Sequence, residues 1–430
     1  MSSMVETRRG CQAVPDAECG VVVGVDISKG HFDWRPCRLS KWGKGGQHPR
    51  SEAGFLAFER QLQRLEAEGL EVWVAMEPTG PYGTCLQEWL LERGWRVVLV
   101  NPYHVHRTKE VSDNSPRKDD RTDPRVIADL VWRGSYCRVR RRAGPYAELR
   151  AGTDEWHSLA KKRTAVRNEA QALLEGWFPE LTEVFTDPLC QSARAVIRRY
   201  VSPQAMRAKG KRSLQAALRR GTQGQGGRYT ESLWEAAQHT VALGEGQERR
   251  GEALRELVRQ VEGIEGRQEQ VAAALAQALA QTEEGEYVRS IPGVGVVLAG
   301  GLLGECGPLA DFPNARAFEK FAGLQLYRES SGTWRGRVRV SKRGRSGVRR
   351  VLGQLAAWHM RAGGLGEAWA QRRKAQGQLP GKVQVALARK LGGVVYTLGK
   401  NRRYFDRDLW DAKAQTADGV RPLQGTPVKA

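Results

Sequence analysis

Short apolar runs that alternate with segments of helical spacing constrain the fold of this 430-residue chain more than any other feature. The apolar runs cover 21–27, 72–76 and 95–100, and the helical segments between them cover 51–65 and 82–93. Runs of this length are typical of buried strands, and apolar residues at three- and four-residue steps are typical of amphipathic helices. Strands that alternate with helices favour a largely parallel sheet covered on both faces. We therefore expect an α/β domain over 20–143, in which 32–39 pairs with the first strand.

Four carboxylates stand at defined points of this alternation. Asp26 and Glu77 end the first two apolar runs, while Asp120 and Asp123 precede a later segment of helical spacing. Active sites in such sheets gather at the carboxyl ends of the strands. One carboxylate there is most often a helix cap, but four in this order can hold Mg²⁺, which prefers oxygen ligands. Asp119 is a rival for Asp120, which we prefer because three-residue spacing places it on the same helical face as Asp123.

The net charge indicates what a metal site of this kind would act on. The chain holds 69 Lys and Arg against 48 Asp and Glu, a formal net charge of +21. An excess of this size favours a polyanionic partner. Two metal ions held by carboxylates can stabilise both the attacking and the leaving oxygen of a phosphodiester. The combination predicts metal-dependent chemistry on nucleic acid.

Other sequence features argue against several classes of protein. The seven cysteines are scattered without CxxC spacing, which argues against a disulfide framework or a structural zinc site and favours a reducing, cytoplasmic location. No apolar run reaches the 18 residues of a membrane span, so we expect no membrane partner. Residues 1–19 are mixed and polar, and we expect a disordered leader there.

The region 144–286, which follows the arginine-rich boundary 138–142, is predicted to be helical. Six apolar residues recur in it at heptad spacing: Leu254, Leu257, Val261, Ile264, Val271 and Leu275. Two arrangements explain this pattern equally well, an antiparallel hairpin with 149–174 or a coiled coil between two copies of the chain. The segment 202–228 is rich in Gly, Gln and Arg and has no acidic residue, so we expect a flexible basic insertion.

A third region, 287–405, opens with the glycine-rich turn 291–295 and an apolar helix. Such a turn suits backbone contact with phosphates, although many helix hairpins use it only to turn. Downstream, the stretch 334–350 has no acidic residue and carries eight basic ones: Arg335, Arg337, Arg339, Lys342, Arg343, Arg345, Arg349 and Arg350. A run this dense and of one sign favours contact with a phosphate backbone. We expect 406–430 to be a tail.

Several short motifs stand in the order of a known family. They are Val-Gly-Val-Asp-Ile-Ser-Lys (23–29), Met-Glu-Pro-Thr-Gly (76–80), Val-Asn-Pro (100–102), Lys-Asp-Asp-Arg-Thr-Asp (118–123), Ile-Pro-Gly-Val-Gly (291–295), Phe-Ala-Gly-Leu (321–324), Ser-Gly (331–332) and Val-Ser-Lys-Arg-Gly (340–344). Over roughly 21–357 the chain resembles the DEDD transposases of bacterial insertion sequences, family one-ten, of the bridge-RNA-guided serine recombinase type. Each motif is short, but their joint order is specific.

The resemblance implies a RuvC-like (ribonuclease-H-like) N-terminal domain, a central helical or coiled-coil linker and a mostly helical C-terminal transposase domain. It implies a Mg²⁺-binding tetrad of Asp26, Glu77, Asp120 and Asp123. It also implies that Ser331 is a nucleophile that forms a covalent link to DNA, with Ser330 as a neighbour that could compete. The implied partners are the DNA of the element ends and target, a structured bridge RNA, and further copies of the chain in a dimer or tetramer.

Two positions depart from the family pattern. Pro124 stands where the family usually has alanine, and Leu326 where it usually has proline. Proline is tolerated in a first helical turn but biases the preceding residue away from the helical region. The relative facing of Asp120 and Asp123 is therefore open.

Two other interpretations use the same residues. A RuvC-type junction-resolving nuclease would use water as the nucleophile and would not need Ser331. A nucleic-acid-binding protein without catalysis would show steep salt dependence but no metal-dependent cleavage. If the serine is the nucleophile, it and the carboxylates lie in separate predicted domains, so two chains could together assemble one active site.

Overall fold

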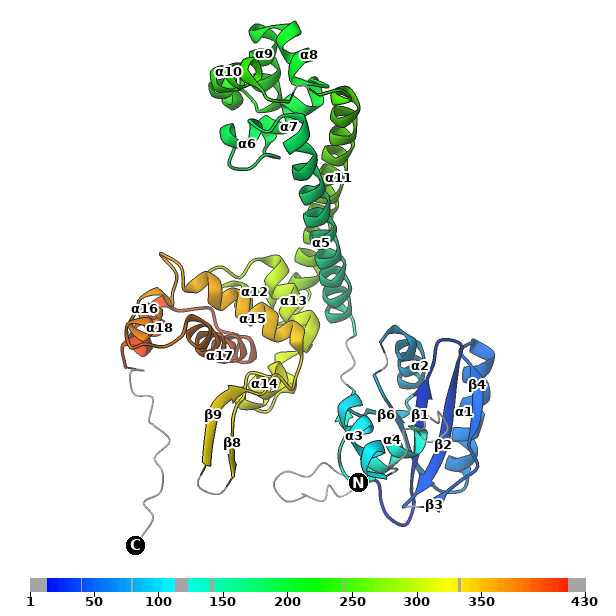
Figure 1. Ribbon diagram of the computed structural model, residues 1–430. Helices are drawn as coiled ribbons and strands as arrows, with labels where there is room; N and C mark the ends of the chain where they lie inside the picture. Colours follow the sequence, from blue (N-terminus) through cyan, green and yellow to red (C-terminus); the bar gives the residue numbers. More distant parts are fainter. Residues whose placement is uncertain are drawn as a thin grey trace. The chain divides into compact units, whose positions relative to one another are not determined.

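The computed structural model describes residues 14–39, 41–78, 80–112, 123–139, 143–242, 244–331 and 334–416. Contacts within the chain separate two units, Met1–Arg141 and Arg142–Ala430 (Figure 1). Each unit has apolar cores of its own.

The first unit is built on a mixed sheet of seven strands. Its elements are β1 (Gly20–Ile27), β2 (His31–Arg38), β3 (Lys41–Trp42), β4 (Gly46–Pro49), α1 (Glu52–Ala67), β5 (Glu71–Met76), α2 (Pro81–Glu92), β6 (Arg96–Leu99), α3 (Pro102–Ser112), α4 (Asp123–Trp132) and β7 (Cys137–Arg138). The strand order is β3-β2-β1-β5-β6-β7, and β4 also pairs with β2.

The strand directions correct one prediction and confirm another. β5 lies parallel between β1 and β6, but β2 and β7 run antiparallel to their neighbours. The prediction of a largely parallel sheet is wrong, because only the turn at 28–30 joins β1 to β2 and a crossover to a parallel strand needs a dozen or more residues. The predicted pairing of 32–39 with the first strand is confirmed, and it places Asp33 opposite Asp26.

Alternate residues of the strands enter two different cores. Val21, Val23 and Val25 of β1 pack with α1 and α2 on one face, whereas Val22 packs with α4 on the other. Side chains of successive strand residues point to opposite faces, so a sheet covered on both sides buries the whole apolar run of β1. This mixed α/β arrangement is consistent with the ribonuclease-H-like domain that the resemblance implies.

The second unit is mostly helical and has two cores joined by two long helices. Its elements are α5 (Pro145–Trp177), α6 (Leu181–Val184), α7 (Gln191–Arg199), α8 (Pro203–Lys209), α9 (Lys211–Gly221), the 3₁₀ helix η1 (Gln225–Tyr229), α10 (Thr230–His239), α11 (Gln247–Ala280), α12 (Gly285–Arg289), α13 (Val296–Cys306), the 3₁₀ helix η2 (Leu309–Asp311), α14 (Ala315–Ala322), β8 (Leu326–Ser331), β9 (Trp334–Val340), α15 (Ser346–His359), α16 (Glu367–Ala375), α17 (Pro380–Asn401) and α18 (Arg407–Thr416).

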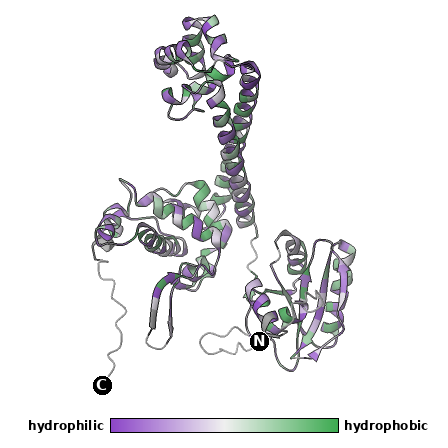
Figure 2. Ribbon diagram, in the orientation of Figure 1, coloured by the Kyte–Doolittle hydropathy of each residue, from purple (hydrophilic) through white to green (hydrophobic). Residues whose placement is uncertain are grey.

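The long helices α5 and α11 lie side by side and antiparallel (Figure 1). α5 runs from one core at Leu149 to the other at Leu174, and α11 returns from Leu254 to Leu275. Between the cores both helices are mainly hydrophilic (Figure 2). The structure therefore shows the first of the two arrangements that the heptad pattern allows, an antiparallel hairpin within one chain. A coiled coil between two chains stays a prediction.

The segment 202–228, predicted to be a flexible insertion, is folded. It holds α8, α9 and most of η1, and Met206, Leu214 and Leu218 are buried in the core that these helices share with α7 and α10. Leu214 and Leu218 stand four residues apart, so one side of α9 is apolar. The prediction of flexibility is wrong because this short amphipathic pattern, between glycine-rich stretches, suffices to bury a helix.

The other core holds α12 to α18 and carries the β8–β9 hairpin. Trp410 of α18 is buried and donates a hydrogen bond from Nε1 to Leu365 O at 3.0 Å. The start of the predicted tail is therefore a helix that belongs to this core, and 417–430 lie outside the described residues. Within the described ranges, every helix is too short or too polar to cross a membrane.

Candidate active site

Asp26 and Glu77 lie on neighbouring strand ends, on the same face of the sheet. β1 and β5 are parallel with Val25 opposite Met76, so Asp26 of β1 lies beside Glu77, the residue that directly follows β5. Ala75, two residues before Glu77, packs against α4, and side chains two apart share a face. Both carboxylates are partly exposed. The strands therefore present them together at the carboxyl edge, on the α4 side.

Asp123 reaches the same edge because α4 approaches β1 very closely. Asp123 is the first residue of α4 and Pro124 the second. A Cβ atom at Gly24 would lie 1.8 Å from Pro124 O, so only glycine lets the start of α4 cross β1 two residues before Asp26. Pro124 does not prevent the helix, because in the first turn the missing N–H has no intrahelical partner to lose.

The charges at this edge influence one another. Lys109 Nζ of α3 forms an ion pair with Asp123 Oδ2. Burial raises the pKa of the Glu77 carboxyl above its usual range, the cationic Lys109 opposes this rise, and the anionic Asp123 adds to it. Glu77, Asp123 and Lys109 therefore form one electrostatic cluster beside Asp26.

The donor chemistry of this edge fits a divalent cation. Asp26, Glu77 and Asp123 offer only carboxylate oxygens, the ligands that Mg²⁺ prefers, and their crowded negative charge is now offset by Lys109. Across the described residues, no group of three His, Cys, Asp or Glu side chains is placed closely enough to hold a metal. Asp120, the fourth member of the predicted tetrad, and its rival Asp119 lie outside the described residues.

Ser331 belongs to the second unit, where it ends β8. It lies opposite Trp334 of β9, and its neighbour Ser330 lies opposite Arg335. The pairing shifts by one residue between Arg328 and Ser330, which is a β-bulge, and bulges re-aim side chains near active sites. Both serine side chains are exposed. The hairpin thus presents a hydroxyl group to solvent at the end of a strand.

The eight basic residues predicted to contact phosphate differ in what they touch. Six have exposed side chains on β9, on α15 or between them: Arg337, Arg339, Lys342, Arg343, Arg345 and Arg350. Arg349 instead donates from Nη1 to Ala322 O and to Lys342 O, at 3.1 and 3.2 Å. It holds the β9–α15 connection against the end of α14, so its role is structural. The side chain of Arg335 lies outside what the structure describes.

Two residues at the carboxylate edge were missed by sequence reasoning, Lys109 and Asp33. Asp33 lies opposite Asp26, accepts a hydrogen bond from Gln47 Nε2 at 3.1 Å, and lines a hollow of about 310 Å³ together with Pro124. The alternation of residues 32–38 could have placed Asp33 on the side of Asp26. Lys109 meets Asp123 only through the packing of α3 on α4, which no spacing in the sequence reports.

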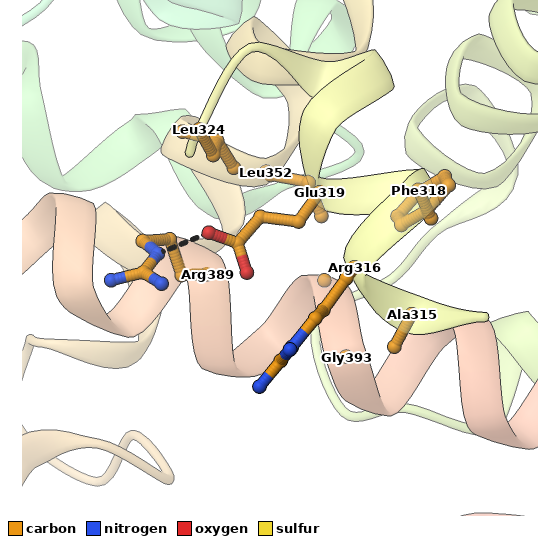
Figure 3. A pocket seen from close by; sticks show the side chains of 9 residues that line it. Ala315, Arg316, Phe318, Glu319, Leu324, Leu352, Arg389 and Gly393 are labelled. Atoms are coloured by element: carbon orange, nitrogen blue, oxygen red, sulfur yellow. Dashed lines mark hydrogen bonds and ion pairs between the residues drawn. The ribbon is translucent and has the colours of Figure 1, made fainter. Parts of the chain in front are cut away.

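A smaller hollow, of about 80 Å³, lies in the C-terminal core between α14 and α17 (Figure 3). Arg389 Nε donates to Glu319 Oε1 across it at 2.7 Å. Most of its other lining residues are apolar or glycine. Because its carboxylate is already paired with an arginine, we assign no chemistry to it.

Two family models match the chain. The model of DEDD transposases of the IS110 type, described as "Transposase", matches residues 23–179. The model described as "Transposase IS116/IS110/IS902 family" matches residues 285–370. The predicted tetrad falls within the first match and Ser331 within the second.

Relatives of the chain come from bacterial insertion sequences. The chain is 24% identical over 387 residues to an uncharacterized protein of insertion element IS116 from Streptomyces clavuligerus, which covers 89% of this chain and 95% of that protein. It is 23% identical over 393 residues to one of insertion element IS110 from Streptomyces coelicolor, covering 90% and 96%. It is 26% identical over 336 residues to the transposase for IS1111A of Coxiella burnetii, covering 77% and 75%. The chain belongs to the IS116/IS110/IS902 family of DNA transposases.

Proposed function

We propose that this transposase cuts and rejoins DNA with Ser331 as the nucleophile and Mg²⁺ held by Asp26, Glu77, Asp120 and Asp123. The observation that supports the proposal is that three of these carboxylates lie at the same edge of the sheet, on the α4 side. Asp26 comes from β1, Glu77 directly follows β5 and Asp123 begins α4, and Lys109 supplies a compensating charge.

Each residue of the edge has a separate task. The paired strands fix Asp26 and Glu77, and the contact of α4 with Gly24 fixes Asp123 beside them. A bound Mg²⁺ supplies polarisation of the phosphate and eases deprotonation of the nucleophile. Lys109 compensates the charge of Asp123 in the structure, and with a cation bound there it would be available to contact the phosphate backbone.

The proposed step at Ser331 conserves the phosphodiester bond energy. Its Oγ attacks the phosphorus, the Oγ–P bond forms, and the bond from phosphorus to one sugar oxygen breaks. The hydroxyl proton passes through solvent to the released sugar oxygen. A sugar hydroxyl of the target can then reverse the step without ATP. The exposed position of Ser331 at a strand end, and the exposed Arg337 and Arg339 on the paired strand, support this role.

A structured bridge RNA as guide and a homo-oligomer as the active species complete the proposal. Both rest on the resemblance to family one-ten. The net charge of +21 is compatible with contact to more than one nucleic acid.

The test uses the full-length protein with the element ends, the guide RNA and Mg²⁺. Ser331→Ala and Asp26→Ala should abolish strand joining, and Ser330→Ala serves as the matched control because it removes the neighbouring hydroxyl. We expect a protein–DNA adduct that survives denaturation with the unaltered protein and with Ser330→Ala, but not with Ser331→Ala.

Each alternative gives a different pattern. Cleavage by Ser331→Ala without any adduct would show a nuclease that uses water. Salt-sensitive DNA binding without cleavage by any variant, at any concentration of Mg²⁺, would show a binding protein without catalysis. Loss of the adduct with Ser330→Ala but not with Ser331→Ala would identify Ser330 as the nucleophile.

A further inference from the structure

The helices between α5 and α11 form a separate module, which we call the tip module (178–246). It contains α6 to α10 and η1, and its core residues include Phe178, Leu214 and Leu233. From residue 180 on it lies between the two family matches, which end at 179 and resume at 285. Neither the carboxylates nor Ser331 belong to it, so the proposed chemistry leaves its purpose unexplained.

The charge of the tip module is strongly one-sided along the sequence. From 188 to 230 there is no Asp or Glu, whereas ten residues are basic: Arg194, Arg198, Arg199, Arg207, Lys209, Lys211, Arg212, Arg219, Arg220 and Arg228. Some of these ten residues form ion pairs with carboxylates that lie outside this stretch. The ion pairs divide the surface of the module into two sides, one paired with acids and one not.

The side that faces α11 is neutralised. Arg194 binds Glu265 of α11 with both terminal nitrogens, at 2.6 and 2.9 Å, and Arg198 pairs with Glu262. These arginines hold α7 onto α11. They are therefore part of the fold and are not available to a partner.

The outer side of α9 is not neutralised. Arg212, Arg219 and Arg220 are seven and eight residues apart, about two helical turns, and lie opposite the buried Leu214 and Leu218. All three side chains are exposed, and among the described residues none of them pairs with a carboxylate. Arg220 Nε donates a hydrogen bond to Ala216 O, one turn earlier in the same helix, at 3.3 Å.

The basic surface continues from α9 onto η1. A Cβ atom at Gly227 would lie 3.3 Å from Arg219 Nε, so the two segments are adjacent. The guanidinium carbon of Arg228 lies 4.8 Å from the centroid of the Tyr229 ring, and Arg228 Nη2 donates a hydrogen bond to the Tyr229 hydroxyl group at 2.8 Å. The guanidinium groups of Arg219 and Arg228 therefore sit on neighbouring backbone segments.

Three exposed arginines elsewhere in this unit are paired with carboxylates. Arg249 and Arg259 of α11 pair with Glu252 and Glu256 of the same helix, and Arg407 of α18 pairs with a carboxylate one turn on. Like charges that stand together without acids repel one another, and the fold gains nothing from them at an exposed site. A row of uncompensated arginines about 10 Å long instead matches a regular array of phosphates.

We propose that the outer face of α9, with Arg228 of η1, binds the phosphate backbone of a double-stranded nucleic acid without reading its sequence. Phosphate contacts of this kind position a protein on a duplex and leave recognition of bases to other elements. A DNA duplex and a paired segment of RNA present the same chemistry, so the test must separate them.

The test measures binding of the full-length protein to a random-sequence DNA duplex and to an RNA duplex of equal length, over a range of salt concentrations. The variant R212Q/R219Q/R220Q is compared with R249Q/R259Q/R407Q, which removes the same charge from paired arginines. For the first variant we expect the slope of log K against log salt to fall by about 2–3, and Kd at moderate salt to rise roughly 10- to 100-fold. The control should keep the slope of the unaltered protein.

A fall of the slope with DNA, with RNA or with both supports the proposal and identifies the polymer. Equal slopes for the first variant and the control with both duplexes would overturn it. R212K/R219K/R220K guards against misfolding, because it keeps the charge and should bind as the unaltered protein does. If the lysine variant loses as much as the glutamine variant, electrostatic contact with phosphates is the wrong explanation. Binding needs no cleavage, so failure of the proposed serine chemistry would not affect this result.

Discussion

Gly24 of β1 is the residue at which a single added methyl group would disturb the carboxylate edge. Its Cβ would lie 1.8 Å from Pro124 O and 3.2 Å from Ala128 N, so α4 would have to move away from β1. We expect Gly24→Ala to lower the free energy of unfolding by roughly 1–3 kcal/mol, as overpacked sites do, and to weaken strand joining because Asp123 moves with α4. Denaturant unfolding and the joining assay measure the two effects.

Gly30→Ala is the matched control for this prediction. Gly30 lies in the turn after the same strand, and an added Cβ there has nothing within 4 Å. Its unfolding free energy should stay within about 1 kcal/mol of the unaltered protein. Equal stability of the two variants would contradict the close crossing of α4 over β1.

At the scale of single residues, the sequence could place the strand carboxylates but not the helical one. Asp26 and Glu77 each stand at the end of an apolar run, and runs of that length form buried strands. In sheets of this kind active sites lie at the carboxyl ends of the strands, so both residues could be placed there from the sequence. The facing of Asp123 depends instead on contact between Gly24 and Pro124, which are a hundred residues apart in the chain. Long-range packing of this kind leaves no periodic signal in the sequence, and Lys109 escaped for the same reason.

At the scale of elements, one ion pair between α7 and α11 should make the stability of the tip module depend on pH. The hydrogen bonds from Arg194 hold the pKa of the Glu265 carboxyl below its ordinary value of 4.5. A lowered pKa means that the stabilisation is present above pH 4.5 and is lost as the pH falls through the lowered value in the folded protein. The side chains are 12% and 29% exposed, so the pair is only partly screened by water.

We therefore expect Glu265→Gln to lower the free energy of unfolding at pH 7 by roughly 1–2 kcal/mol, and expect this difference to vanish in acid. Denaturant unfolding at a series of pH values measures it. Glu269→Gln removes an exposed carboxylate one turn further along α11 and should change little at any pH. A deficit of Glu265→Gln that persists unchanged in acid would mean that the ion pair is not its cause.

The composition of 202–228 predicts a flexible segment, but the structure shows helices there. Its glycines, glutamines and arginines suggest a loop, yet Leu214 and Leu218 supply one apolar side to α9. A helix this short gives too few repeats for periodicity to stand out, and its stability comes from packing against α7 and α10. The pairing of β2 with β1 follows from the short turn between them. The alternation of strands and helices nevertheless favours a largely parallel sheet, and it does not report the direction of the strands at the edges.

At the scale of the whole molecule, the carboxylates lie in the first unit and Ser331 in the second. The arginine-rich stretch 138–142 marked the boundary before the second unit in the sequence, and in the structure Gly144 takes a φ of 58° just before Pro145 begins α5. Spacing along the chain reports local elements, and it carries no information on whether the two halves of a site come from one chain or from two. That question is open to a direct experiment.

We expect the two halves to come from different chains of an oligomer. Asp26→Ala and Ser331→Ala should each be inactive alone, while a mixture regains joining because one chain supplies the intact carboxylates and another the serine. In randomly mixed dimers half of the molecules are mixed and each holds one intact site of two, which gives roughly a quarter of the normal activity. A mixture of Asp26→Ala with Glu77→Ala is the matched control, because both changes damage the same half of the site and no combination restores it. If the first mixture stays inactive although differently tagged chains are shown to exchange, each site is built within one chain.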